Sequence, residues 1–272
     1  MNKVFHSTIK INSAEKYFRK FLQIAPLSVA VWRAVEARYL STVKLPHPIL
    51  DIGCGFGEFA LGFSDIVVDV GIDIAQKDID IAKQCGKYKK VVLGDARKMP
   101  FKNETFSSIF SISTFEHIIN PQKVIQETYR VLKGGGILVA TIETEAVDRQ
   151  TFYRGFLEKI GLQSASKFLL KKYNRLFHRN VIVNKNIWLR YLKNAGFSIE
   201  RSEDIISPSV VKIYDFFMIT AWLSQIPRPI IGKRIVYRPA FITNILTKIF
   251  LPFMDKKETN GTNLFIVARK PK

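Results

Sequence analysis

Cysteine is scarce in this chain of 272 residues, which contains only Cys54 and Cys85. Two cysteines far apart in the sequence argue against a disulfide framework or a zinc site, and they favour a reducing, intracellular location. The N-terminal segment also lacks the continuous apolar run of a secretory signal. Two strongly apolar stretches, 213–226 and 240–254, are shorter than the roughly 20 residues that cross a bilayer. We therefore expect a cytoplasmic chain with no transmembrane helix and no metal site.

Acidic residues are few as well, since 23 Asp and Glu stand against 42 Lys and Arg, a net charge of +19. The imbalance is concentrated in the second half. Residues 145–272 carry 23 basic and 9 acidic residues, whereas residues 1–144 carry 19 and 14. Such asymmetry predicts that the second half faces an anionic partner. Nucleic acid, an anionic membrane and a phosphorylated small molecule all meet this requirement.

Short apolar runs alternate with helical patterns from residue 48 onward, and this alternation predicts a parallel sheet with right-handed crossovers. The expected fold is α/β, with a doubly wound, mostly parallel seven-stranded sheet (Rossmann-like), N-terminal helices and a helical C-terminal insertion and cap. Strands are expected at 48–52, 66–73, 91–93, 106–112, 136–142, 197–201 and 263–268. Helices are expected at 27–40, 121–132 and 187–194.

The same pattern divides the chain into six segments. An N-terminal helical segment (1–45) precedes a ligand-binding core (46–144), which continues at 186–204 and ends in the final strand and tail (261–272). Residues 145–185 and 205–260 do not fit the repeating unit of strand and helix. We interpret the first as a helical insertion over the carboxyl edge of the sheet and the second as an apolar, basic helical cap.

Glycines follow the first expected strand at alternate positions, in the segment Asp51-Ile52-Gly53-Cys54-Gly55-Phe56-Gly57. Glycines allow a tight turn and the close approach of the backbone to a ligand. The spacing differs from the dinucleotide fingerprint G-x-G-x-x-G. Asp73 ends the second strand 20 residues after Gly53. A carboxylate at this position can accept both hydroxyls of a ribose, while its alternative role is to cap the next helix.

The third and fourth strands are followed by further candidate binding residues. Asp95 and Ala96 come after the third strand, where a carboxylate can accept a hydrogen bond from an adenine amino group; Asp95 could equally cap a helix. Ser113 follows the fourth strand and precedes His117. Because the carboxyl ends of parallel strands bind ligands in such sheets, all these positions are expected at one edge.

In this order and spacing, the segments LDIGCGFGEF, GIDI, GDARKMPF, NETFSSIFSISTFEHI and RVLKGGG resemble the class I S-adenosylmethionine-dependent methyltransferase superfamily. They are most similar to its branch of quinone, sterol and other small-molecule or lipid methyltransferases. The resemblance covers about a third of the chain and implies S-adenosylmethionine as cofactor. It implies that Asp51, Gly53, Gly55 and Gly57 line the methionine part, that Asp73 binds the ribose, that Asp95 and Ala96 bind the adenine, and that Ser113 approaches the amino acid moiety.

Methyl transfer needs positioning and the exclusion of water more than it needs a nucleophile on the protein. A general base helps when the acceptor is a weakly acidic hydroxyl or a protonated amine. His117 and Glu143 are the candidates, each with a packing or capping role as the alternative. Tyr153 and His178 are weaker candidates.

The expected function is methylation of a small-molecule or lipid-linked acceptor, with nucleic acid as the less favoured partner and the oligomeric state undetermined. Lys and Arg flank the apolar stretch 240–254, a pattern that fits either a helix lying on the inner face of an anionic membrane or a packed core helix. The basic run between Lys167 and Arg179 is either a solvated helix face or an anion contact. An RNA methyltransferase and a catalytically silent binding or scaffold protein of the same fold are the alternative functions.

Overall fold

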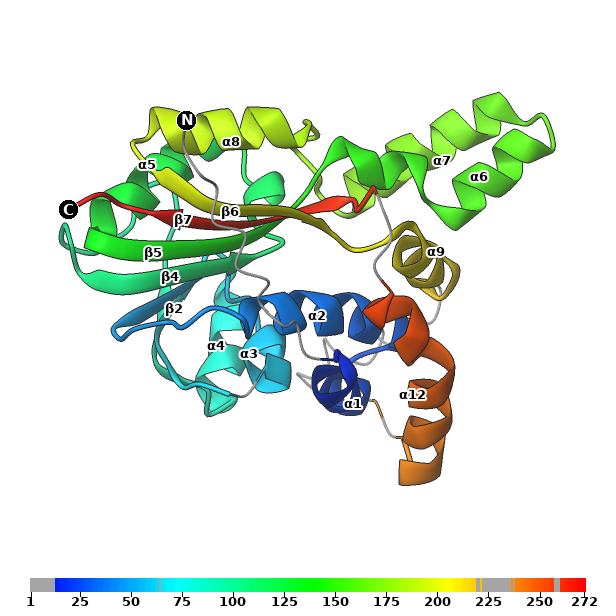
Figure 1. Cartoon of the computed structure of the whole chain (residues 1–272), viewed down its shortest axis with the longest axis horizontal. Coiled ribbons are helices and arrows are strands. Elements are labelled where there is room, and N and C mark those ends of the chain that lie inside the picture. Colours follow the sequence, from blue (N-terminus) through cyan, green and yellow to red (C-terminus); the bar gives the residue numbers. More distant parts are fainter. Residues whose placement is uncertain (1–12, 64, 219–220, 222–235, 237, 257–259) are drawn as a thin grey trace, which may run out of the picture.

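A seven-stranded sheet of strand order β3-β2-β1-β4-β5-β7-β6 runs through the computed structural model (Figure 1). The structure describes residues 13–63, 65–218, 221, 236, 238–256 and 260–272. All pairs from β3 to β5 are parallel, whereas β7 pairs antiparallel with both β5 and β6. The predicted doubly wound, mostly parallel sheet is therefore confirmed. The strands are β1 (Ile49–Ile52), β2 (Val68–Asp73), β3 (Tyr88–Leu93), β4 (Phe106–Ile112), β5 (Leu132–Glu143), β6 (Ser198–Ile205) and β7 (Asn263–Arg269).

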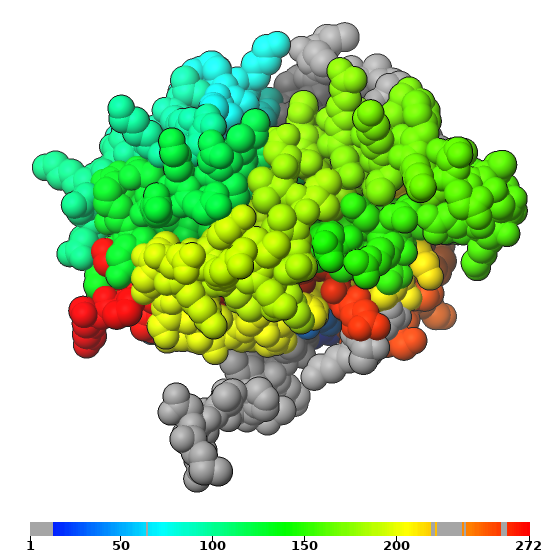
Figure 2. Space-filling model, turned by 90° about the horizontal axis from the view of Figure 1, so that it is seen from above, coloured from blue at the N-terminus to red at the C-terminus, as the bar shows by residue number. Residues whose placement is uncertain are grey.

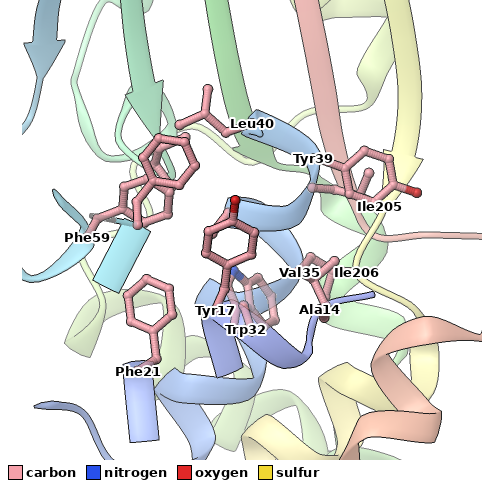
Figure 3. Close-up of a cluster of buried hydrophobic side chains, with 14 of the residues drawn as sticks. Ala14, Tyr17, Phe21, Trp32, Val35, Tyr39, Leu40, Phe59, Ile205 and Ile206 are labelled. Carbon is pink, nitrogen blue, oxygen red and sulfur yellow. The ribbon is translucent and has the colours of Figure 1, made fainter. Parts of the chain in front are cut away.

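Helices cover both faces of the sheet. On one side lie α1 (Glu15–Ile24), α2 (Leu27–Leu40), α3 (Glu58–Phe63) and α4 (Gln76–Gln84); on the other lie α5 (Pro121–Val131) and α8 (Lys185–Asn194). Each side has its own buried core. Figure 3 shows the first of them, where Tyr17, Phe21, Trp32 and Val35 from α1 and α2 pack beneath the sheet beside Phe59 of α3. This packing fixes α2 directly under the strands.

The strand after α5 starts earlier than its sequence predicts. The three consecutive glycines after Lys133 predict a turn and a strand from residue 136, but Leu132 already pairs with Phe106 of β4. The register then shifts, so that Ile137 pairs with Ser108. The glycines thus form an irregularity inside β5, which follows α5 without a separate loop.

The remaining helices gather at one end of the molecule. The turns η1 (Phe115–His117) and η2 (Glu145–Arg149) follow β4 and β5, and α6 (Phe152–Lys159) and α7 (Gln163–Leu176) form a helical hairpin that projects from the body (Figure 1). The helices α9 (Pro208–Phe216) and α12 (Ala240–Asp255) lie at the same end. No helix among the described residues is long and apolar enough to cross a membrane. Part of the apolar stretch 213–226 lies outside the described residues.

Candidate active site

Backbone hydrogen bonds tie the loops after neighbouring strands together at the carboxyl edge of the sheet. The amide of Gly53 donates to the carbonyl of Ile72 at 2.9 Å, and the amide of Gly94 donates to the carbonyl of Asp73 at 2.9 Å. On the other side of β1, the amide of Ser113 donates to the carbonyl of Thr141 at 2.9 Å. The glycine turn, the loop with Asp95 and the loop with Ser113 therefore share one edge.

Asp73 holds the glycine turn in place. One carboxylate oxygen accepts from the amide of Gly55 at 2.8 Å and the other from the amide of Ala75 at 3.0 Å, so Asp73 also binds the start of α4. Gly55 has a positive φ of 51°, and a Cβ added there would meet no atom within 4 Å. Gly53 differs, because its Cβ would lie 2.3 Å from the side chain of Thr114. Open space for a ligand therefore lies at Gly55, while Gly53 permits the close approach of two loops.

Asp51 is buried beneath the glycine turn. Its side chain is 3% exposed and accepts a hydrogen bond of 2.6 Å from the hydroxyl of Tyr88. Burial raises the pKa of Asp51 to about 7, and the nearby carboxylate of Asp73 acts in the same direction, whereas the Tyr88 hydroxyl opposes both. A cation bound at this edge would favour the ionised form of Asp51.

Asp51 should therefore make the stability of the unliganded protein depend on pH. Its pKa is raised on folding, so the stability present at low pH falls as pH rises from about 4 to about 7. Asp51→Asn keeps an acceptor for Tyr88 but has no charge to bury, and we expect it to gain stability relative to wild type across this window, by at most about 4 kcal/mol. Urea unfolding at a series of pH values measures the difference. A constant difference between pH 4 and 7 would contradict the expectation.

Asp95 lies at the same edge but is engaged by a neighbour. The guanidinium of Arg97 forms a bidentate pair with its carboxylate, with Nη2 at 2.7 Å, and this hydrogen bonding lowers the pKa of Asp95. Arg130 of α5 fixes the loop that follows, because it donates to the carbonyls of Met99 and Phe101 at 3.1 and 2.7 Å. The sequence did not reveal these hydrogen bonds to the loop, because Arg130 lies about 30 residues further along the chain.

A cavity of about 1110 Å³ lies beside the carboxyl edge. It meets the glycine turn at Phe56 and Glu58 and the later strands at Ser113 and Glu143. Its walls come from α2, α7 and α9. Most of the wall surface is apolar, with contributions from Val29, Trp32, Leu169, Leu170, Leu176 and Met218, although eight charged residues also line the cavity.

A buried ion-pair network forms the polar part of the cavity wall. Nε of Arg179 lies 3.0 Å from a carboxylate oxygen of Glu143, and the same guanidinium pairs with Asp148. The Arg179 side chain is 2% exposed. Burial raises the pKa of Glu143, against the opposing effect of Arg179. Arg179 thus belongs to the cavity and not to the exposed basic run in which its sequence position places it.

Glu116 adds a second buried carboxyl group behind Glu143. It accepts a hydrogen bond of 3.1 Å from the amide of Glu143, and its other carboxylate oxygen is buried without a hydrogen-bond partner among the residues that the structure describes. Burial and the neighbouring Glu143 raise the pKa of Glu116 well above its ordinary value. Glu116 therefore holds its proton more strongly than an exposed carboxyl group does.

Helix α2 links the cavity to the carboxyl edge through Glu36, a residue that the sequence did not mark as functional. One oxygen of Glu36 accepts from the hydroxyls of Ser113 and Thr141 at 2.6 and 2.8 Å, and the other pairs with Arg33 at 2.7 Å. Arg33 and Trp32 line the cavity. Helix α2 thus supplies part of the cavity wall.

Of the candidate bases, His117 and Glu143 both line the cavity. Nδ1 of His117 lies 3.3 Å from the carbonyl oxygen of His178, and burial lowers the pKa of the His117 imidazole. His117 is therefore neutral near pH 7. Of the expected cofactor residues, Ser113 lines the same cavity, while Asp51, Gly53, Gly55, Gly57, Asp73, Asp95 and Ala96 are not among the residues lining it. The cavity and the expected cofactor site are neighbours, joined at Phe56 and Ser113.

Comparison with known proteins identifies the class of protein to which this fold belongs. Residues 50–140 match the family Methyltransf_11, a methyltransferase domain. The chain is 32% identical to uncharacterized protein MJ1123 of Methanocaldococcus jannaschii over 60% of this chain and 71% of that protein. It is 35% identical to sterol 4-C-methyltransferase strm-1 of Caenorhabditis elegans over 37% of this chain and 33% of that protein. It is 32% identical to a tRNA (carboxymethyluridine(34)-5-O)-methyltransferase of Arabidopsis thaliana over 42% of this chain and 28% of that protein.

A solved structure of similar fold is a methyltransferase of Thermotoga maritima described as a possible histamine N-methyltransferase. Its TM-score is 0.55 at 19% identity, over 90% of this chain and 91% of that one. This likeness shows the fold. With the family match, it places the chain among the class I enzymes that use S-adenosylmethionine: the chain belongs to the S-adenosylmethionine-dependent methyltransferase family. The chain spans only about a third of the length of the sterol and tRNA relatives.

The described residues fit the cofactor of this family in two respects. Open space adjoins Gly55, and the Asp73 carboxylate lies directly beside it. The carboxyl group of Asp51 is buried beneath the turn, where a bound sulfonium cofactor would favour its ionised form. No group of three potential metal ligands occurs among residues that the structure describes.

Proposed function

We propose that this methyltransferase acts on a small-molecule or lipid-linked acceptor that binds in the cavity between α2, α7 and α9. The observation that carries the proposal is the position of this largely apolar cavity, which meets the cofactor edge at Phe56 and Ser113. Pockets of this kind bind ligands mainly by apolar contact, with a few polar groups that fix orientation. An acceptor there would present its reacting atom to the cofactor while its apolar body contacts the wall.

The cofactor assignments of this proposal are those that the resemblance to the methyltransferase superfamily implies, and their position at one edge supports them. Asp51 and the glycine turn (Gly53, Gly55 and Gly57) would hold the methionine part, Asp73 the ribose, and Asp95 with Ala96 the adenine. Ser113 would approach the amino acid moiety. S-adenosylmethionine supplies an activated methyl group on a sulfonium, so the chain's own task is to position the two reactants and exclude water.

Glu143 and His117 are the groups that could accept a proton from the acceptor. Both line the cavity, and His117 is neutral near pH 7, as a base must be. The carboxylate of Glu143 is paired with the guanidinium of Arg179, so it is less available to accept a proton. We therefore favour His117 as the base for an acceptor that must lose a proton, with Glu143 as an orienting group.

A labelling experiment tests the proposal. Purified protein with methyl-labelled cofactor and a cell extract should transfer label into the organic-solvent fraction. Val29→Trp adds bulk to the cavity wall, and we expect it to lower the kcat/KM for that acceptor at least tenfold while the affinity for the cofactor is unchanged. Val67→Trp is the matched control, because Val67 is exposed and does not line the cavity. Label in bulk RNA instead would reverse the assignment, and no label in any fraction would favour a catalytically silent protein.

The structure supports each of the two alternatives for residues 240–254, a membrane-surface helix and a packed helix, in part. Along α12, Phe241, Ile245, Ile249 and Phe253 form a stripe at a spacing of four, and all are more than 40% exposed. Arg238, one of the expected flanking cations, instead donates to the carbonyl of Ala25 at 2.9 Å. Its flanking partners Lys233, Arg234 and Lys257 lie outside the described residues.

A further inference from the structure

The α6–α7 hairpin exposes several large apolar side chains. No residue of α6 is buried, and Ser166 is the one buried residue of α7. Phe156, Ile160, Leu162 and Phe168 are 55%, 53%, 49% and 60% exposed. Figures 1 and 2 show that the hairpin extends outward at one end of the molecule. Exposed apolar groups gathered on a projecting element mark an interaction surface.

The hairpin is also strongly basic. Residues 152–176 contain six basic residues and one acidic residue, Glu158. The acid is already paired, because Nε of Arg154 lies 2.8 Å from its carboxylate. Helical spacing places Lys167 and Lys171 on one face of α7, near Phe168, and none of the three lines the cavity. The partner of this face must therefore combine negative charge with an apolar layer.

An anionic bilayer meets both requirements. Cations on such a surface attract anionic headgroups, and apolar side chains between them enter the boundary with the acyl chains. A second copy of this chain would bring the same excess of positive charge to the contact, which disfavours self-association through this face. Ile160 and Leu162 flank the turn at the tip, where they are placed to enter the bilayer first.

The same helix forms the rim of the cavity. Leu169 and Leu176 line the cavity and are also 38% and 61% exposed. Helix α7 thus carries Lys167 and Lys171 away from the cavity, while its leucines, with Lys172 and Arg175, line the space in which the acceptor is proposed to bind. These two leucines extend the apolar wall of the cavity to the surface of the hairpin.

We propose that the α6–α7 hairpin docks on an anionic lipid bilayer and that the methyl acceptor enters the cavity from that bilayer along α7. This inference rests on the proposed function, because it assumes an apolar acceptor. It assigns the exposed part of the basic run to lipid headgroups and locates the membrane contact on the hairpin, next to the cavity mouth.

Sedimentation with phosphatidylcholine vesicles that contain phosphatidylglycerol tests the charge contribution. The full chain should bind these vesicles, bind pure phosphatidylcholine vesicles far less, and lose affinity as salt is raised. Lys167→Gln/Lys171→Gln should weaken binding about thirtyfold, since each cation near an anionic surface contributes about fivefold. Lys123→Gln/Lys133→Gln is the matched control, because it removes the same charge at exposed positions of α5 and β5, away from the hairpin. Equal losses in both variants, or no binding by wild type, would overturn the proposal.

A second pair of variants tests the apolar contribution. Ile160→Ser/Leu162→Ser should lower vesicle affinity at least tenfold at constant charge, since it removes the side chains that enter the bilayer. Val67→Ser/Ile119→Ser, at exposed apolar positions outside the hairpin, should leave it unchanged. Unchanged binding by the tip variant would overturn the proposal, as would binding to a single-stranded RNA oligonucleotide that exceeds binding to vesicles and depends on Lys167 and Lys171.

The vesicle assay does not require catalysis, so the two proposals can fail separately. A chain that binds anionic vesicles but transfers no methyl group to any extract would contradict the proposed function alone. A chain that methylates an acceptor dispersed in detergent but does not bind vesicles would contradict the hairpin proposal alone.

Discussion

Gly55→Ala is expected to lower the affinity for S-adenosylmethionine at least a hundredfold. A methyl group at this position would extend into the open space beside the glycine turn, where the proposed cofactor site lies and where no protein atom is within 4 Å. Displacing the cofactor would break hydrogen bonds to its charged groups, each worth about 1.5–3 kcal/mol, so the loss of one or two lowers affinity about a hundredfold. Isothermal titration calorimetry with the cofactor measures the change directly.

Gly86→Ala separates this effect from backbone strain. Gly86 also has a positive φ, 68°, and also faces open space, but it follows α4 away from the turn. Both substitutions should reduce the free energy of unfolding by about 1 kcal/mol, because both place an L side chain in the left-handed region. We expect only Gly55→Ala to lose cofactor affinity. If Gly55→Ala bound the cofactor with wild-type affinity, the glycine turn would not be part of the cofactor site.

Arg179→Gln is expected to lower the free energy of unfolding by about 3–5 kcal/mol. The Arg179 side chain is 2% exposed and pairs with both Glu143 and Asp148, so its removal leaves carboxylates in a buried wall without their cation. In thermal unfolding, this corresponds to a decrease in Tm of roughly 10 °C for a domain of this size. Arg149→Gln removes an exposed pair with Glu145 and should change stability by at most about 1 kcal/mol.

A double substitution identifies the origin of that loss. Arg179→Gln/Glu143→Gln removes the cation and one of its two carboxylates, so it should be more stable than Arg179→Gln alone. The single variant should also recover stability as pH falls, because protonation of Glu143, whose pKa burial already raises, removes the unpaired charge. A double variant no more stable than Arg179→Gln would show that loss of packing, not of charge pairing, is responsible.

The sheet could be predicted because its signals are local. Each parallel strand is a short apolar run that ends in a glycine or a polar residue, and the positions of Gly53, Asp73 and Asp95 follow from that order alone. Because the strands pair in parallel, these three residues then lie together at the carboxyl edge of the sheet. Strand ends were less certain, as the irregular start of β5 shows, because pairing with β4 and not local preference decides them.

The cavity could not be predicted in the same way. Trp32, Arg33 and Glu36 lie on α2, which is buried around most of its circumference, so the helix has no single apolar stripe that identifies its partner. Arg179 stands in the sequence among exposed cations, and only its position in the fold brings it to Glu143. Contacts between residues far apart in the chain carry no local signal.

The hydrogen bonds of Glu36 join the wall of the proposed acceptor cavity to the strand ends beside the proposed cofactor site, so the two ligands would be coupled energetically. Helix α2 provides cavity wall at Trp32 and Arg33, and through Glu36 it holds Ser113 and Thr141 on the cofactor side. A displacement of α2 by one ligand therefore changes the site of the other. Thermodynamic linkage makes that coupling reciprocal: whatever factor the cofactor contributes to acceptor affinity, the acceptor returns to the cofactor.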